Sequence, residues 1–240
     1  MYLTRFRFNT GRSEARRLLG SPHLMHGAVN MSFPVLPPRG GDQPRVLWRV
    51  DQDHRATTTL YIVSPARPDL THLVEQAGWP TTGAEGWSTF AYTDFLDALK
   101  EGDTWRFRLT ANPVHSIRLP GDSRDAPTKR TAHRTPRHQK RWLLERQEKA
   151  GFEVVRKPDE QQLTERGDEY ELVVRDQLPL QFRRPPAQPG RDDVRFTRVT
   201  FDGRLRITDR ATFRRVLTQG LGKAKAYGCG LLTLAPVARR

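Results

Sequence analysis

Met1-Tyr-Leu-Thr-Arg-Phe-Arg-Phe8 opens the chain with a pattern of period two. The aromatic residues and Thr4 fall on one face of an extended backbone, while Arg5 and Arg7 fall on the other. This alternation is typical of a β-strand that is buried on one side only. The chain is therefore expected to begin inside a sheet.

Helix and strand signals follow this strand in the order β-α-β-β-α-β. Ser13 can cap a first short helix, and Ser21-Pro22 has the capping residue and the first-position proline that start a second helix, predicted to reach Phe33. Strands are expected at 45–50 and 57–63, a helix at 69–77 and a weaker strand at 87–92.

The second half repeats this order more loosely, without sequence similarity between the halves. It has strand signals at 104–109, 152–155, 169–174 and 181–183, helix signals at 135–150 and 209–218, and a last strand after residue 230. Asp202-Gly203 is a strong hairpin signal and predicts a turn between strands 194–201 and 204–207. We expect an α+β protein with two tandem ferredoxin-like (βαββαβ, RRM-like) domains, residues 1–98 and 101–240, and a basic cleft between them.

Charge points to a polyanionic partner. The 240 residues carry a net charge of +14 and a pI near 10.8. Residues 1–100 hold 11 Lys or Arg against 9 Asp or Glu, whereas residues 101–240 hold 30 against 18. Nucleic acid is the expected partner, bound mainly by the second half. No apolar run of membrane-spanning length, basic amphipathic helix or signal-peptide pattern is present, so a cytoplasmic protein without membrane contact is expected.

The segment Gly220-Leu-Gly-Lys-Ala-Lys-Ala-Tyr-Gly-Cys-Gly230 combines glycines, which allow close backbone approach, with two lysines. It lacks the Gly-Lys-Ser/Thr ending of a P-loop and the spacing of a dinucleotide fingerprint, so no nucleotide cofactor is expected. An extended phosphate-bearing partner fits better. The alternative is that the glycines form a helix end and a tight turn. The predicted contacts are Gly220, Gly222, Lys223, Lys225, Gly228 and Gly230.

His26 is the candidate catalytic group. The chain has a single cysteine, Cys229, and no short metal-ligand spacing among its histidines, so neither a disulfide framework nor a metal site is expected. An imidazole titrates near neutral pH and can move a proton while an RNA backbone is cut. His23, three residues earlier, lies on the same helix face and could assist. The alternative is that both histidines only pack or face solvent.

Basic residues dominate positions 118–146, and arginines there can track a phosphate backbone. Arg183-Arg184 end a predicted strand, where a β-ribbon could place guanidinium groups in a helical groove. A solvated helix face is the alternative. The aromatic signature of single-strand RNA readers is missing, so structured RNA is preferred. The predicted RNA-binding residues of these regions are Arg130, Arg134, Lys140, Arg141, Arg183 and Arg184.

Nearly the whole chain resembles one family, the CRISPR repeat-processing endoribonucleases of the type I-E Cascade system, called CasE. The resemblance rests on the opening strand, on Ser21-Pro-His-Leu-Met-His26, on Phe107-Arg-Leu-Thr-Ala-Asn-Pro113 and on the segment Gly220 to Leu232. It implies two ferredoxin-like domains, metal-independent cutting at the base of a repeat stem-loop, and ends with a 2′,3′-cyclic phosphate and a 5′-hydroxyl. It also implies continued binding to the product and entry into the Cascade complex.

By this resemblance His26 matches the catalytic histidine, and Arg183 and Arg184 match a basic hairpin that reaches the stem. His23 stands where the family commonly has tyrosine, and Gly27 stands where a basic residue is often found. The expected partners are CRISPR repeat RNA and other Cascade subunits, with a monomer when free and no cofactor. A non-catalytic scaffold for structured RNA is the alternative function, and a DNA-binding regulator lacks a recognisable helix-turn-helix.

Overall fold

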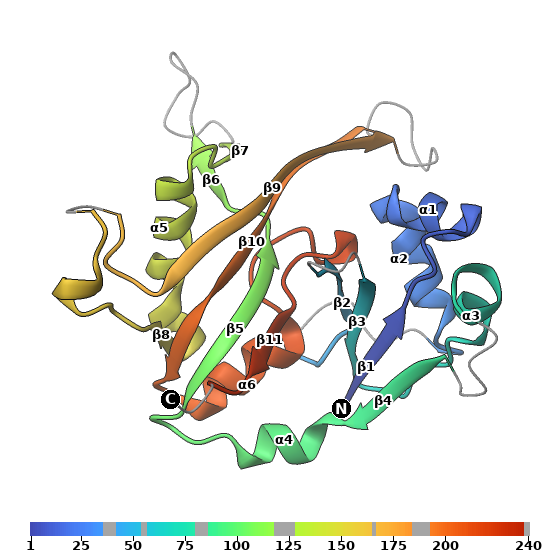
Figure 1. Ribbon diagram of the computed structural model, residues 1–240, viewed down its shortest axis with the longest axis horizontal. Coiled ribbons are helices and arrows are strands. Elements are labelled where there is room, and N and C mark those ends of the chain that lie inside the picture. The colour runs from blue at the N-terminus through green and yellow to red at the C-terminus, as the bar shows by residue number, and fades with distance from the viewer. Residues whose placement is uncertain are drawn as a thin grey trace.

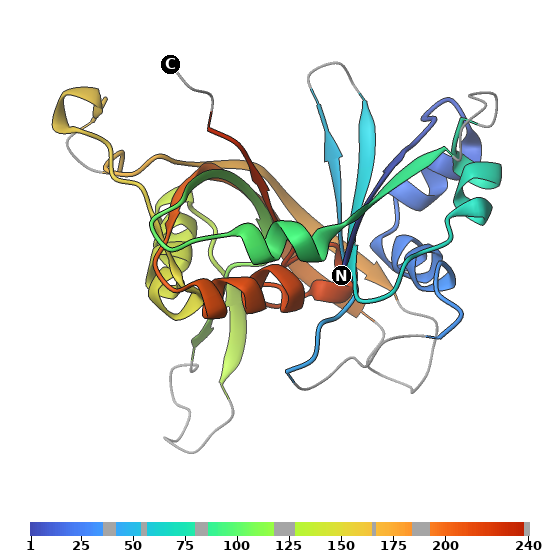
Figure 2. The same ribbon diagram turned by 90° about the horizontal axis from the view of Figure 1, so that it is seen from below.

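Two antiparallel sheets stand side by side and organise the molecule (Figure 1). In the computed structural model, the described residues are 1–35, 42–53, 57–79, 86–117, 128–164, 167–183 and 193–237. In Figure 2, the helices of the first unit lie to the right of the first sheet, and the helices of the second unit lie toward the left of the molecule, with the second sheet.

The first unit follows the predicted β-α-β-β-α-β order, with the first connection made by two helices. Its sheet has the order β2-β3-β1-β4, in which every neighbouring pair is antiparallel. The elements are β1 (Tyr2–Arg7), α1 (Ser13–Leu19), α2 (Pro22–Met31), β2 (Leu47–Gln52), β3 (Thr58–Ser64), α3 (Thr71–Ala77) and β4 (Trp87–Ala91).

Alternation along the strands decides which face the three helices cover. Phe6, Leu60 and Ile62 are fully or almost fully buried and pack with Met25 and Leu73 of the helices. Arg5 and Arg7 lie on the opposite face and are exposed, as the opening pattern predicts.

The second unit repeats the strand order of the first, as β11-β5-β10-β8. Two insertions enlarge it: a β6–β7 hairpin between the first strand and its helix, and β9, which pairs with β10. Helix α4 (Tyr92–Ala98) leads from the first unit to the second. The elements of the second unit are β5 (Thr104–Ala111), β6 (Val114–Ile117), β7 (Lys129–Ala132), α5 (Pro136–Gln147), η1 (Glu148–Ala150), β8 (Phe152–Val154), η2 (Asp159–Gln161), β9 (Leu172–Arg183), β10 (Asp193–Ile207), α6 (Arg210–Gln219), η3 (Lys225–Tyr227) and β11 (Leu232–Ala235).

The hairpin predicted at Asp202-Gly203 is wrong. Both residues lie inside β10, which runs unbroken from Asp193 to Ile207 and pairs with β5 through this point. Glycine is needed here for close packing, because a Cβ atom on Gly203 would lie 2.3 Å from the Glu171 carbonyl oxygen and 2.9 Å from the Phe107 ring. An Asp-Gly pair in a hairpin turn and an Asp-Gly pair inside a closely packed strand look the same in the local sequence.

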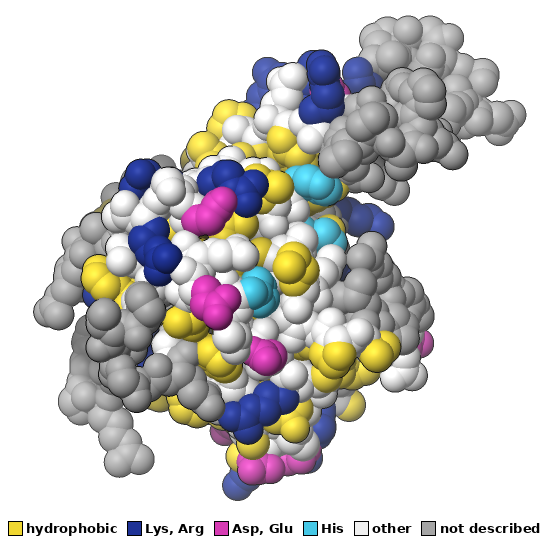
Figure 3. Space-filling model, turned by 90° about the vertical axis from the view of Figure 1, so that its right-hand side faces the viewer, with side chains coloured by type: hydrophobic (Ala, Val, Ile, Leu, Met, Phe, Trp, Pro, Cys, Tyr) yellow, Lys and Arg dark blue, Asp and Glu magenta, His cyan; other side chains and the backbone are white. Residues whose placement is uncertain are grey.

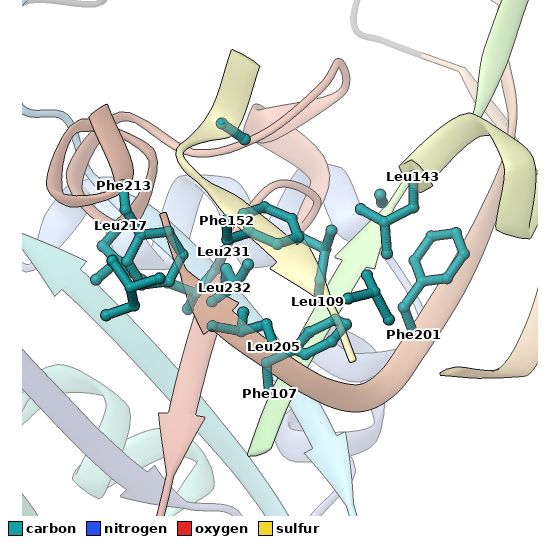
Figure 4. Packing of buried hydrophobic residues seen from close by; sticks show 14 of the residues in the cluster. Phe107, Leu109, Leu143, Phe152, Phe201, Leu205, Phe213, Leu217, Leu231 and Leu232 are labelled. Carbon is teal, nitrogen blue, oxygen red and sulfur yellow. The ribbon is translucent and has the colours of Figure 1, made fainter. Parts of the chain in front are cut away.

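Apolar side chains from all six common elements of the second unit meet in one core (Figure 4). Phe107 and Phe201 from the sheet lie with Leu143 of α5 and Phe213 of α6. Leu47 and Val63 of the first sheet belong to the same buried cluster, so the two units share a hydrophobic interface.

Arg49 of β2 ties the units together with polar contacts. Its side chain is only 2% exposed and forms a two-pronged ion pair with Asp51, with Nε–Oδ1 and Nη2–Oδ2 distances of 2.6 and 2.9 Å. The same guanidinium donates to the Arg108 and Leu231 carbonyl oxygens and to Thr233 Oγ1 in the second unit. A buried guanidinium is tolerated because its donors are satisfied across the interface.

Candidate functional site

Helix α2 presents His26 at a half-buried position. Ser21 caps the helix by accepting a hydrogen bond from the Leu24 N–H at 3.3 Å, and Pro22 occupies the first turn, as the sequence predicts. Met25 and Val29 face the core, which leaves His26 at the edge of the buried stripe. His26 Nε2 lies 3.3 Å from Nδ2 of Asn30, one turn later, so Asn30 helps to orient the ring.

The glycine-rich segment lies directly against this helix. Its short helix η3 packs on α2 and places the Tyr227 ring edge-on to His26, with the ring centroids 6.5 Å apart and the planes at 68°. Tyr227 is 8% exposed. The structure therefore brings the candidate catalytic residue and the glycine-rich segment together, although they lie near opposite ends of the chain.

The glycines of this segment fit between the two units. Gly228 has a φ of +77°, and a Cβ atom there would lie 2.7 Å from the Trp48 ring of the first unit. Gly222 lies beside Trp142 of the second unit. Gly220 ends α6, where its N–H donates to the Val216 carbonyl oxygen, as the helix-end alternative predicts. Gly228 and Gly230 are buried, so their described contacts are with protein, and a direct RNA contact by any of these glycines stays a prediction.

The two lysines of the segment differ in burial. Lys223 is exposed, whereas Lys225 in η3 is half-buried. Burial, together with the positive charges of Arg45 and Lys223, lowers the pKa of Lys225 to about 8. Three cationic side chains are thus concentrated on one side of the junction between the units. A phosphate placed among them would relieve their mutual repulsion.

Strands β9 and β10 form a long arm that carries Arg183. The far end of the arm lies above α1 and α2 in Figure 1. Phe182 and Phe196, one from each strand, contact Tyr227 with ring centroid distances of 4.9 and 5.9 Å. Arg183 is exposed at the end of β9, and its Nε lies 3.7 Å from Oδ1 of Asp193 across the strand pair. Arg184 lies outside the described residues.

The basic residues around α5 lie far from His26. In Figures 1 and 2, α5 and α2 stand at opposite ends of the molecule. Arg134 is exposed, Lys140 Nζ donates to the Gly167 carbonyl oxygen at 2.8 Å, and Arg141 forms an ion pair with Glu145 at 2.8 Å. Arg130 lies in β7, opposite Ser116. A common RNA would have to extend from the arm to α5 to touch both regions.

A groove of about 600 Å³ separates α1, α2 and β2 of the first unit from β5, β9 and β10 of the second. The sequence predicts a basic cleft, but the described lining is mixed in charge. It contains Arg108, Arg175, Arg198, Asp51, Asp53 and Asp176. Figure 3, which looks onto the side that carries α1 to α3, likewise shows histidines among scattered basic and acidic side chains.

Ion pairs explain why the groove does not carry the full charge of its arginines. Arg108 binds Asp202 at 2.6 Å and lies 3.6 Å from Asp51, while Arg175 lies 3.4 Å from Asp202. The hydrogen bond to Asp202 is the largest of several effects that raise the pKa of Arg108. These carboxylates lie on strands β2 and β10. A count of charge along the sequence does not show which arginines they pair with.

The described residues hold neither a metal-binding cluster nor a membrane-spanning helix. No group of three or more His, Cys, Asp or Glu side chains within them has the geometry to hold a metal ion. No helix among them is long and apolar enough to cross a membrane.

Comparison with known proteins assigns the chain to a family. The sequence profile of the family described as CRISPR associated protein matches residues 1–236. The chain belongs to this family. The resemblance inferred from the sequence motifs is thereby confirmed, and so is the fold that it implies.

One relative of this CRISPR-associated chain is the CRISPR-associated endoribonuclease Cse3 of Thermus thermophilus, which is 29% identical over 238 residues, or 98% of this chain and 100% of the relative. The structure of that Cse3 bound to an RNA representing a pre-cleavage complex superimposes with a TM-score of 0.74 at 27% identity, covering 98% of each chain. A chain of a pre-nicking CRISPR RNA-guided surveillance complex shares the fold, with a TM-score of 0.62 and 21% identity over 99% of this chain and 100% of that one.

Sequence reasoning missed Tyr227, which lies beside His26 in this CRISPR-associated chain, and the two phenylalanines that contact Tyr227. Tyr227 lies inside the glycine-rich segment that drew attention for its lysines, and Phe182 directly precedes Arg183. The presence of an aromatic residue in a glycine-rich segment was the sequence signal that could have identified Tyr227 as a site residue. Its partner could not be identified, because α2 and η3 are adjacent only after both units have folded.

Proposed function

We propose that the chain is an endoribonuclease that cuts the stem-loops of CRISPR repeats in precursor RNA, with His26 as its catalytic residue. The supporting observation is the position of His26: a half-buried imidazole at the edge of α2, beside Tyr227 of the glycine-rich segment, which also carries Lys223 and Lys225. The similarity to Cse3, an endoribonuclease whose structure has been solved with RNA, supports the same reaction class.

The proposed reaction is an internal transfer at phosphorus. The ribose 2′-oxygen forms a bond to the adjacent phosphorus while the bond from phosphorus to the 5′-oxygen breaks. The 2′-hydroxyl gives up a proton and the leaving 5′-oxygen takes one, so the products carry a 2′,3′-cyclic phosphate and a 5′-hydroxyl. No metal or cofactor takes part in this scheme.

His26 can serve either proton transfer. In the neutral ring, an N–H donated by Asn30 to Nε2 requires the ring proton to be on Nδ1, so this contact selects one tautomer. A ribose hydroxyl that replaces Asn30 could give its proton to Nε2, and the protonated ring could supply the leaving oxygen. His23 lies half-buried in the first turn of the same helix, three residues before His26, and is proposed to assist by holding the scissile phosphate.

The proposed RNA surface begins at Lys223 and Lys225, follows the arm to Arg183 and Arg184, and continues to Arg130, Arg134, Lys140 and Arg141. The glycines of the segment would shape its narrow end. We place the domain boundary between residues 98 and 101, since α4 ends at Ala98 and β5 begins at Thr104. The proposed protein is a cytoplasmic monomer that keeps its product and joins other Cascade subunits.

Replacement of His26 by alanine tests the proposal. The protein is incubated with a repeat stem-loop RNA in EDTA, at saturating protein, and single-turnover cleavage and fragment ends are measured. His26→Ala is expected to slow cleavage by about 100-fold or more, the lower range for loss of acid–base catalysis, while RNA binding is retained. His138→Ala, which removes an exposed histidine near the start of α5, is the matched control and should cleave normally.

Three results would contradict the proposal. Cleavage that requires a divalent ion would exclude the metal-independent scheme. Equal rates for His26→Ala and wild type would exclude the assigned residue. Tight binding of repeat RNA without any cleavage would favour the non-catalytic scaffold. A substrate with a 2′-deoxy sugar at the cut site should bind and remain intact, because its nucleophile is missing.

A further inference from the structure

Three parts of the protein meet at Tyr227. Its ring contacts His26 of α2 on one side and Phe182 and Phe196 of the arm on the others. The ring is almost completely buried, whereas His26 is half-buried and Arg183, the neighbour of Phe182, is exposed. An interior side chain thus connects the candidate catalytic residue to a surface predicted to bind RNA.

The backbone around Tyr227 leaves its ring little freedom. Ala224 and Gly228, on either side of η3, both have left-handed conformations, with φ values of +60° and +77°. The Gly228 backbone is held closely against Trp48. Side-chain packing of this density permits few alternative ring positions.

We infer that Tyr227 is a positioning residue for the cleavage reaction: it holds the His26 imidazole in place and links that ring to the β9–β10 arm. The inference rests on the proposed function. The imidazole packs against the Tyr227 ring, and the two phenylalanines of the arm pack against the same ring and keep it in position. RNA bound at Arg183 would therefore act, through Phe182 and Tyr227, on the position of the imidazole.

Position matters strongly in this reaction. Proton transfer requires the imidazole nitrogen within hydrogen-bond reach of the ribose hydroxyl or the leaving oxygen. A displacement of about 1 Å caused by a distant substitution can slow an enzyme by about 100-fold. Loss of the Tyr227 ring should therefore reduce the rate of the chemical step much more than the affinity for RNA.

The test compares Tyr227→Leu with Tyr227→Phe. Leucine keeps apolar bulk but loses the ring, and is expected to slow single-turnover cleavage by about 10- to 100-fold at saturating protein, with the Kd for repeat RNA changed by less than about threefold. Phenylalanine keeps the ring and should retain most of the rate. Tyr170→Leu is the matched control, because Tyr170 is half-buried and forms an isolated β-bridge with Arg156, so its replacement should leave the rate unchanged.

Two further variants separate positioning from a general structural effect. The double variant His26→Ala/Tyr227→Leu should be no slower than His26→Ala alone, because the ring acts only through the imidazole. Phe182→Leu leaves η3 unaltered and should slow cleavage by less than Tyr227→Leu, since Phe196 still covers Tyr227. This variant also carries the test if Tyr227→Leu does not fold.

The outcomes are distinguishable from failure of the proposed function. If His26→Ala abolishes cleavage while Tyr227→Leu and Phe182→Leu cleave at the wild-type rate, the positioning role is wrong and the proposed function stands. Additive losses in the double variant would also overturn the positioning role. If His26→Ala itself cleaves normally, the proposed function fails first.

Discussion

The two units share a strand order but use it differently. The first sheet has strands of five to seven residues, and three helices cover one of its faces. The second sheet contains a β10 of 15 residues, paired along most of its length with a β9 of 12 residues, and residues 101–240 carry most of the net charge. The two units share a strand order, and the strand inserted into the second unit contacts Tyr227, which lies beside the histidine of the first.

This division explains why the candidate site belongs to neither unit alone. The first unit provides His26 on a well-capped helix, and the second provides Tyr227, Lys225 and the arm. Between them, arginines and aspartates neutralise one another at the interface, as Arg49 and Asp51 do. Positive charge therefore remains available at Lys223 and Lys225, beside the interface, where RNA is proposed to bind.

The largest expected effect is on stability, and it comes from removing the Arg49 side chain that joins the two units. Arg49→Ala removes a buried guanidinium and leaves Asp51 and three acceptors of the second unit without their donor. Breaking a buried ion pair in this way costs about 3–5 kcal/mol in free energy of unfolding. Urea denaturation followed by tryptophan fluorescence measures it.

Arg5→Ala is the control for Arg49→Ala, because Arg5 lies exposed on the same sheet and should change the free energy of unfolding by less than about 0.5 kcal/mol. An Arg49→Ala protein as stable as the control would show that the apolar interface alone holds the two units together.

The next largest effect is on RNA affinity, and it shows whether the arm or α5 contributes more to RNA binding. Arg183→Ala is expected to weaken binding of repeat RNA and to reduce the slope of log affinity against log salt by about 1, the value for one phosphate contact. Arg141→Ala should reduce that slope by less, because the Arg141 guanidinium binds Glu145 at 2.8 Å, whereas Arg183 lies 3.7 Å from the Asp193 carboxylate. Filter binding at several salt concentrations gives both slopes, and a larger change for Arg141 would move the main contact surface to α5.

The smallest effect concerns Lys225, whose pKa is lowered to about 8. As pH rises from 7 to 9 its ammonium group loses its charge, so affinity for RNA should fall by about three- to fivefold, the scale of one partly exposed ion pair. Lys225→Arg stays charged throughout this range and should bind with much less pH dependence. If wild type and Lys225→Arg respond to pH alike, Lys225 does not contact the RNA.

Most of the fold follows from local patterns. Period-two alternation locates β1, and the capping residues Ser21, Thr135 and Asp209 mark the starts of α2, α5 and α6. Local patterns were insufficient where one signal has two meanings. At Gly203, the same Asp-Gly pair that favours a turn serves a continuous strand, and only the proximity of Glu171 and Phe107 decides between the two.

The sequence by itself determined the class of fold, the net positive charge and the choice of His26, because these depend on residue type and near-neighbour spacing. Tertiary structure alone decided that Tyr227 lies against His26, that Phe182 and Phe196 hold Tyr227, and that carboxylates offset the arginines of the groove. Such contacts join residues distant in the chain. They arise when buried surfaces pack together, which no local pattern encodes.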